Sequence, residues 1–225
     1  DCFVIPLADA FRENFVNELN ELTSFVKKLK IPCYVIGVGL KESYEPDFSQ
    51  PKPQDEAVKK FVTAVLEKSN CIGVRGELTG KYLETLGFAE GRDFMVIGCP
   101  SMYMKGKRLH IQNPKLDVNS KVCFNSNVAA SVPTRKFIKL KMKEFENHYF
   151  IGQVVNELRS IYLGAPYEYK IEYNFRNVTD KIYQDGRLRF FCNVPKWMEF
   201  LNDSDLTFGS RLHGNIAAVL AGTPA

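Results

Sequence analysis

The feature that most constrains the fold of this chain is the alternation of short, continuously apolar runs with longer amphipathic segments. Continuous apolar runs predict strands buried on both faces, and apolar positions at 3.6 periodicity predict helices. Strands are expected at Cys2–Ile5, Cys33–Val38, Cys71–Val74, Phe94–Ile97, Val122–Asn125, Tyr149–Ile151, Arg189–Cys192 and Leu206–Phe208. Between them, helices are expected to carry Phe15 to Leu29, Val58 to Leu66, Leu78 to Leu86, Arg135–Glu146, Val154–Leu163, Pro195–Asn202 and Asn215–Ala221. This pattern predicts an α/β protein whose parallel sheets are covered on both faces by helices.

The alternation lapses between Gly98 and Ser120 and then restarts, which predicts two units. We expect an N-terminal Rossmann-like unit over residues 1–98 that lacks its first strand, a linker over 99–120, and an incomplete C-terminal Rossmann-like unit over 121–225. The chain begins with Asp1 directly before a strand and ends in a turn, so we interpret it as truncated at both ends.

Composition narrows the function classes. The 225 residues carry a net charge of +4, too mild for a nucleic-acid footprint, and no apolar run approaches the length of a membrane span. The three histidines are not spaced as metal ligands, so no zinc or other metal site is expected. The six cysteines form no CxxC pair, and those in apolar runs are expected to be buried and reduced: Cys2, Cys33, Cys71, Cys123 and Cys192. A cytoplasmic protein is the natural interpretation.

The segment from Asp205 to Asn215 is the sharpest candidate site. An expected strand runs into a glycine-containing turn and a helix begins a few residues later, which places Arg211 and His213 where free N–H groups and the helix dipole favour an anion. Arg211 offers a planar fork for carboxylate or phosphate, and His213 can exchange a proton near neutral pH. A structural histidine and an ordinary ion pair are the alternative from local chemistry alone.

This segment also carries a resemblance. "DLTFGSRLHGNIAAVLAGTPA" resembles the C-terminal signature of the polysaccharide pyruvyl transferase family, approximately D-x-x-x-G-x-R-x-H-G-x-x-A-x-x-x-G-x-P. Upstream, "LEKSNCIGVRGELTGKYLETLG", "IPCYVIGVGL" and "VIGCPSMYM" are similar to further blocks of that family in the same order. One departure is Cys99 before Pro100, where many members have Asp.

The resemblance implies a two-domain GT-B-like fold with the units facing a cleft. It implies transfer of a pyruvyl group from phosphoenolpyruvate to two hydroxyls of a sugar, giving a cyclic ketal in cell-surface polysaccharide biosynthesis. The family's phosphoenolpyruvate-binding residues match Arg211 and His213, with His213 as the catalytic acid–base, and its other arginine matches Arg75. No cofactor is implied beyond the donor, and the acceptor is a free sugar or a lipid-linked oligosaccharide.

Further polar residues follow expected strands. Asp9 and Arg12 follow the first expected strand, and Asn125 and Ser126 end the first strand of the second unit. These residues could contact a ligand in the cleft, or they could simply cap a helix or form a turn. A catalytic carboxylate could come from Asp9, Glu77 or Asp205. For Arg75, an ion pair with Glu77 or Glu84 is the alternative.

The basic run Arg135–Lys143 predicts a solvated helix face, or else a peripheral contact with the inner face of a membrane that would suit a lipid-linked acceptor. Two other functions stay open. A GT-B-type glycosyltransferase using a nucleotide sugar would carry an acidic ribose- or diphosphate-binding motif, and none is convincing. A non-catalytic sugar- or anion-binding relative would retain the fold without turnover.

Overall fold

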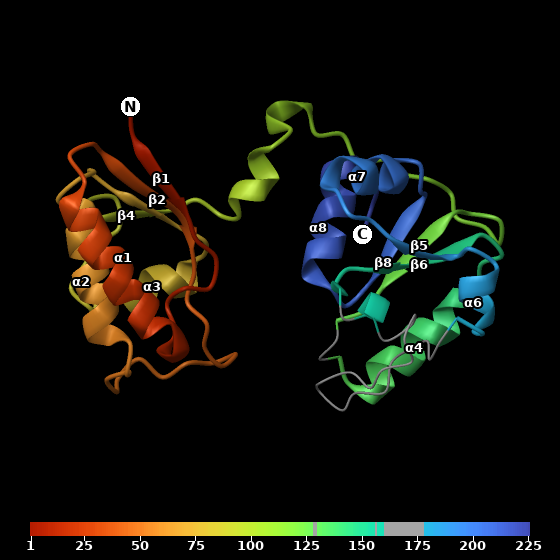
Figure 1. The fold of residues 1–225 in the computed structure, drawn as a ribbon, viewed down its shortest axis with the longest axis horizontal. Helices are drawn as coiled ribbons and strands as arrows, with labels where there is room; N and C mark the ends of the chain where they lie inside the picture. The colour runs from red at the N-terminus through yellow and green to blue at the C-terminus, as the bar shows by residue number, and fades with distance from the viewer. Residues whose placement is uncertain (128–129, 156, 160–177) are drawn as a thin grey trace. The chain divides into compact units, whose positions relative to one another are not determined.

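The computed structural model describes residues 1–127, 130–155, 157–159 and 178–225 (Figure 1). The chain divides into two compact units, Asp1–Tyr103 and Met104–Ala225. Each unit contains a four-stranded parallel sheet with helices packed on it. The α/β class expected from the alternating pattern is therefore confirmed.

The first unit follows a simple βα succession. Its strands are β1 (Phe3–Pro6), β2 (Cys33–Val38), β3 (Ile72–Val74) and β4 (Phe94–Val96), paired in the order β1-β2-β3-β4. The connections are η1 (Glu13–Phe15) with α1 (Val16–Lys28), then α2 (Asp55–Leu66) and α3 (Glu77–Thr85), and the short turn η2 (Pro100–Tyr103) ends the unit. All four strands run parallel, so their carboxyl ends lie at one edge of the sheet.

One face of the first sheet holds the core of this unit. Ile5 of β1 and Val35 of β2 are buried against the helices, together with Leu19, Phe61 and Leu83 of α1, α2 and α3. The alternate strand residues point to the other face, where Val4, Tyr34 and Met95 remain 44, 42 and 55% exposed. The expectation that helices cover both faces is wrong for this sheet in the part of the chain that the structure describes. A parallel sheet shows period-two burial when only one face is covered.

The second unit has a different strand order. After η3 (Gly106–Arg108) come β5 (Val122–Asn125), β6 (His148–Gly152), β7 (Leu188–Phe190) and β8 (Leu206–Gly209), paired in the order β7-β6-β5-β8. Its helices include α4 (Val132–Met142), α6 (Lys181–Gln184), α7 (Val194–Asn202) and α8 (Leu212–Ala221). The chain builds β5, β6 and β7 to one side and then returns, so that β8 pairs with the free edge of β5.

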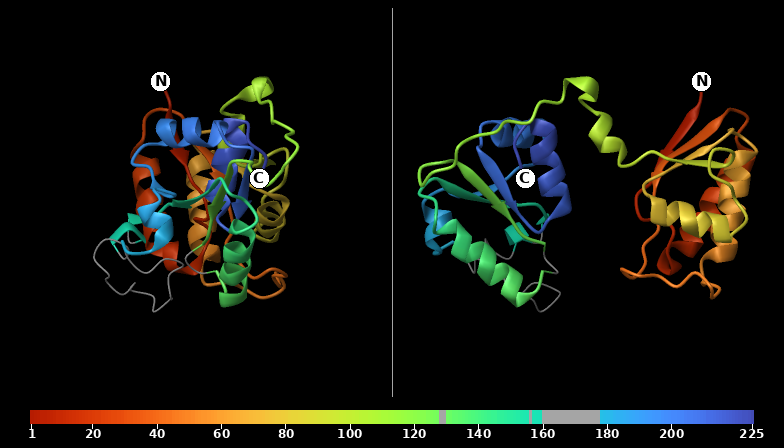
Figure 2. Two further views of the ribbon diagram at one scale, coloured as in Figure 1. Left: turned by 90° about the vertical axis from the view of Figure 1, so that its right-hand side faces the viewer. Right: turned by 180° about the vertical axis from the view of Figure 1, so that it is seen from behind.

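Helices cover both faces of the second sheet, as the sequence predicts. Phe124 of β5 packs with Ile138 of α4 on one face, and its neighbour Cys123 packs with Leu201 of α7 and Ala218 of α8 on the other. Figures 1 and 2 accordingly show α4 on one side of this sheet and α8 on the other. Two separate cores therefore hold this unit together.

Two helices begin three residues earlier than their periodicity predicts. Helix α4 starts at Val132 because the Ser131 hydroxyl accepts the Thr134 backbone N–H at 3.3 Å, an N-cap that precedes the apolar pattern. Helix α8 starts at Leu212, which makes Arg211 its N-cap residue. Of the helix expected over Val154–Leu163, residue 156 and residues 160–163 lie outside the described residues.

The cysteine expectation needs one correction. Cys33 and Cys123 are buried, but Cys71 is only partly buried and Cys2 and Cys192 are exposed, since each of these three lies just outside a strand rather than within one. All six thiols are unpaired in the described residues, which contain every cysteine of the chain. Among the helices of those same residues, none has the length and apolar character that crossing a bilayer requires.

Candidate functional site

The strand order of the second unit creates a switch point between β5 and β8. Strands β6 and β7, which follow β5 in the chain, are added on one side of β5, whereas β8 pairs with its opposite side. In open parallel sheets, the connections after two such strands diverge to opposite faces and leave a crevice beyond the carboxyl ends, where ligands bind. The residues that follow β5 and β8 are Ser126 and the segment Ser210-Arg211-Leu212-His213. The sharpest sequence motif thus lies at the point of this unit best suited to a ligand.

Asn125, the last residue of β5, holds the two sides of this switch point together. The residue is 1% exposed. Its Oδ1 accepts the backbone N–H of Arg211 at 2.8 Å, and its Nδ2 donates to Oδ1 of Asn215 at 2.9 Å. Asn215 in turn donates from Nδ2 to the carbonyl of Gly209 at 3.0 Å. Both ends of the Asn125 amide are engaged, so this residue orients the start of α8.

Arg211 and His213 flank the N-terminus of the ten-residue helix α8. Arg211 is half-buried and His213 is exposed. The Arg211 Nε is buried and has no hydrogen-bond partner among the described residues, and none of the ion pairs within them involves Arg211. Among the described residues, the guanidinium is therefore not committed to a carboxylate. A cationic fork, a titratable ring and free helix N–H groups together favour an anion.

Two glycines allow the close approach of elements at this point. An added Cβ at Gly209 would lie 2.4 Å from Oδ1 of Asn125, and one at Gly214 would lie 2.9 Å from its Nδ2. The Gly214 position would also lie 2.4 Å from Nε2 of Gln153, a buried amide nitrogen with no partner in the described part of the chain. Gln153 follows β6, and no sequence pattern singled it out. The sequence around β6 contains no motif that would have identified Gln153 as a candidate.

Gln153 is itself held from the helix side. The carboxylate of Glu157, buried in the structure, accepts the backbone N–H groups of Gln153 at 2.5 Å and Val154 at 3.1 Å. Ser126 is also buried, and its hydroxyl donates to the carbonyl of Asn127 at 3.3 Å. The switch point is thus lined by amides and hydroxyls that neighbouring backbone groups position.

In the first unit, Arg75 follows β3 at the carboxyl edge of the sheet. Its Nε donates to the carbonyl of Gly37 at 3.0 Å and its Nη2 contacts the carbonyl of Leu7 at 3.4 Å. No ion pair in the described residues joins it to Glu77 or Glu84, so the expected alternative for this arginine is wrong. Arg75 ties together the ends of the first three strands through backbone carbonyls, because those strand ends converge on it.

Cys99 lies in the turn after β4, beside Arg75. Burial raises the pKa of its thiol, but hydrogen bonds from the Ser101 side chain and backbone, the charge of Arg75 and the backbone of Met102 together lower the pKa below its usual value. The turn that holds Cys99 packs tightly on β2, since an added Cβ at Gly37, whose φ is +73°, would lie 2.5 Å from the Pro100 ring. The position that departs from the family pattern therefore carries a thiol with enhanced anionic character.

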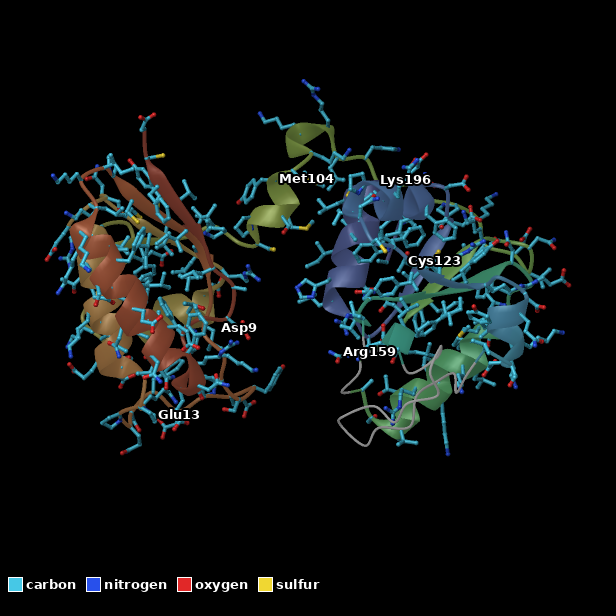
Figure 3. The ribbon with its side chains drawn as sticks, in the orientation of Figure 1. Asp9, Glu13, Met104, Cys123, Arg159 and Lys196 are labelled. Carbon is cyan, nitrogen blue, oxygen red and sulfur yellow. The ribbon has the colours of Figure 1, made fainter. Side chains whose placement is uncertain are left out.

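The three candidate carboxylates lie at different places. Asp9 pairs with Arg12 at 2.6 Å on the loop after β1, and Asp9 is labelled in Figure 3. Glu77 opens α3 after β3. Asp205 precedes β8 and accepts the backbone N–H of Lys121 at 2.8 Å, so it lies at the amino end of that strand. Because His213 follows the carboxyl end, Asp205 is a structural residue at the opposite edge of the sheet.

Arg12 is placed on the loop between β1 and α1, where its guanidinium lies over the Phe15 ring at 5.2 Å. The basic run lies on α4 and its C-cap: Lys136 and Lys139 on the helix and Lys143 at its C-terminal end are exposed. Within the residues that the structure describes, no group of three or more histidine, cysteine, aspartate or glutamate side chains is arranged to hold a metal ion. The side chains that the described residues place at the candidate site are an arginine, a histidine and several amides.

Comparison with known proteins agrees with the sequence motifs. No curated protein and no solved structure matches the chain. The model of the family described as polysaccharide pyruvyl transferase matches residues 5–225, which is nearly the whole chain and includes both arginine blocks. A match of this extent shows that the chain belongs to the polysaccharide pyruvyl transferase family.

Proposed function

We propose that this protein is a cytoplasmic transferase that moves a pyruvyl group from phosphoenolpyruvate to two hydroxyls of a sugar, forming a cyclic ketal. One observation carries the proposal: Asn125 accepts the backbone N–H of Arg211 at the N-terminus of α8, where Arg211 has no ion pair with a described residue and His213 is exposed, beside a topological switch point. Family membership supports the reaction class. The GT-B-type architecture that the resemblance implies is part of the same proposal.

The donor's charges suit the residues present. Phosphoenolpyruvate carries a carboxylate and a phosphate, and each anionic group calls for a cationic fork or free N–H groups. Arg211 and the first turn of α8 supply one such environment in the second unit. We assign Arg75 as the second donor-binding arginine, with its strand-tying contacts leaving part of its guanidinium for a ligand.

The reaction needs one proton delivered and two removed. Protonation at the methylene carbon of phosphoenolpyruvate converts it to a methyl group and leaves an oxocarbenium-like centre at the adjacent carbon. One sugar hydroxyl adds there and loses its proton. A second hydroxyl then displaces phosphate and loses its proton, which closes the ketal. His213 is the proposed proton carrier, and a positioned acid–base group of this kind contributes about 10²–10⁴-fold in rate.

Binding and turnover separate the proposed roles. Arg211→Ala removes a charge-assisted contact of about 1.5–3 kcal/mol, so phosphoenolpyruvate affinity in calorimetry should fall by about ten- to a hundred-fold. Arg75→Ala should lower that affinity to a similar degree. His213→Gln should reduce phosphate release more than donor affinity, because the proton acts in the transition state.

The decisive assay incubates the protein with phosphoenolpyruvate and a panel of free and lipid-linked sugars, and follows phosphate and a pyruvyl mass increment. Turnover of His213→Gln at the wild-type rate would contradict its acid–base role. Release of a nucleoside diphosphate from a nucleotide sugar would identify a glycosyltransferase instead. Donor binding without any transfer would identify a non-catalytic relative.

A lipid-linked acceptor would also bring the basic face of α4 to a membrane, as part of the same proposal. Each lysine near an anionic surface adds about 1 kcal/mol of attraction. Sedimentation with vesicles containing anionic lipid, compared with neutral vesicles, measures this contact.

A further inference from the structure

The first unit contains a pocket that the donor chemistry does not use. It has a volume of about 610 Å³ and is lined by Arg12, Glu13, Asn14, Lys41, Glu42 and Gln54, with Lys52 and two prolines completing it. This volume lies within the range of about 300–1,000 Å³ typical of small-molecule sites. We call it the proline pocket, after Pro51 and Pro53 in its lining.

The proline pocket lies beyond the carboxyl ends of β1 and β2. The loops after these strands continue the pairing of the sheet, because Phe11 donates its N–H to the carbonyl of Gly39 at 3.1 Å and Lys41 donates to the carbonyl of Phe11 at 3.1 Å. Arg12 to Asn14 and Lys41 to Glu42 extend directly from this hydrogen-bonded pair of loops. Figure 3 labels Glu13 on this segment. The backbone of the pocket is thus pre-formed at the edge where parallel sheets bind ligands.

Several side chains of the pocket are also held in place. Gln54, which is 2% exposed, donates from Nε2 to Oε1 of Glu42 at 3.2 Å. The same carboxylate oxygen pairs with Nζ of Lys52 at 3.3 Å, and the Lys52 backbone N–H donates to Asp55 at 2.8 Å. These contacts fasten one wall to the start of α2. Pre-formed polar groups of this kind lower the entropy cost of binding.

The charges of the pocket are balanced, which selects its ligand. Arg12 is paired with Asp9 at 2.6 Å and Lys52 with Glu42 at 3.3 Å, so two of the three cations are already neutralised by carboxylates. Lys41 lies 4.0 Å from Asp9. An anion would have to compete with these carboxylates. A neutral polyhydroxylated ligand would not, because each hydroxyl both donates and accepts and can bond to carboxylates, amides and cations alike.

We propose that the proline pocket binds a neutral sugar unit of the saccharide acceptor. The exposed amide of Asn14 and the carboxylates of the lining bond its hydroxyls, Gln54 holds Glu42 in place behind them, and the saturated rings of Pro51 and Pro53 supply apolar contact for its C–H groups. This inference rests on the proposed function for the identity of the sugar as an acceptor, but the pocket's capacity to bind a sugar is tested without turnover.

The test is a titration of the isotopically labelled 225-residue protein, followed by amide chemical shifts. The probes are the methyl glycosides of glucose, galactose, mannose and N-acetylglucosamine, and separately inorganic phosphate. At least one glycoside should shift the side-chain amides of Asn14 and Gln54 and the backbone amide of Lys41. Asn14→Ala should weaken that binding about three- to tenfold, since one neutral hydrogen bond is lost. Lys59→Ala, an exposed change elsewhere on α2, is the matched control and should leave it unchanged.

Three outcomes would overturn the proposal: no shift at these amides with any of the glycosides, equal binding by Asn14→Ala, or shifts at the same amides with phosphate instead. Phosphoenolpyruvate titrated into the same sample reports separately on the amides of Arg211 and Asn215. Sugar shifts in the pocket without donor shifts would sustain the sugar site and refute the proposed function. Donor shifts without sugar shifts would do the reverse.

Discussion

Replacing Asn125 with alanine should lower the free energy of unfolding of the second unit by about 2–4 kcal/mol. The change leaves the Arg211 N–H and the Asn215 Oδ1 without the partners that now lie at 2.8 and 2.9 Å. A buried polar group that loses its partner costs about 1–3 kcal/mol, and two are orphaned here. Because Asn215 is only half-buried, the lower part of the doubled range applies. A loss of this size is a large share of the roughly 5–15 kcal/mol that stabilises a domain.

The chain contains a built-in probe for this measurement. Trp197 is its single tryptophan, and it packs against the core formed by Cys123 and Leu201 in the second unit. Urea unfolding followed by tryptophan fluorescence therefore reports on the unit that contains Asn125. With a typical slope of about 2 kcal/mol per molar urea, the midpoint should fall by about 1–2 M.

Asn119→Ala is the control, because it removes the same amide from an exposed position of the same unit. Its midpoint should stay within about 0.3 M of the unsubstituted protein, since exposed changes alter stability by about 0.5 kcal/mol or less. Equal midpoints for Asn125→Ala and the unsubstituted protein would refute the argument that this amide holds α8 to β5.

Three further changes test other parts of the fold. Iodoacetamide should label Cys99 at a lower pH than Cys123, because the pKa of Cys99 is lowered whereas burial raises the pKa of Cys123 to about 11. Mass spectrometry across a pH series measures the labelling, and equal pH profiles for the two cysteines would contradict this prediction. Tyr82→Phe should destabilise the first unit by about 1.5–3 kcal/mol, because it removes the 2.7 Å hydrogen bond from the Tyr82 hydroxyl to Asp55. Urea unfolding followed by circular dichroism measures this, and an unchanged midpoint would contradict it. Gly37→Ala should lower the free energy of unfolding of the first unit by about 1–3 kcal/mol, because the backbone φ of +73° disfavours alanine and the added Cβ would lie 2.5 Å from the Pro100 ring. An unchanged thermal unfolding temperature would contradict this prediction.

The sequence by itself determined the elements and their class. Cys33–Val38 and Val122–Asn125 are strands with the bounds that their apolar runs predict, because a continuous apolar run has few other ways to be buried. The sequence also identified Arg211 and His213 as a pair at a strand-to-helix junction, since a glycine turn and a following small-residue helix are local features.

Tertiary structure alone decided which strands are neighbours. No local sequence feature of Leu206–Gly209 indicates that this strand pairs with β5 rather than with β7. The pairing of β8 with β5 creates the switch point. The roles of Asn125 and Gln153 depend on it, since their partners lie many residues away along the chain. Sequence periodicity reports which face of an element is buried, whereas the contact that buries it is a long-range event. For the same reason the open face of the first sheet and the balanced charges of the proline pocket emerge only when distant segments pack together.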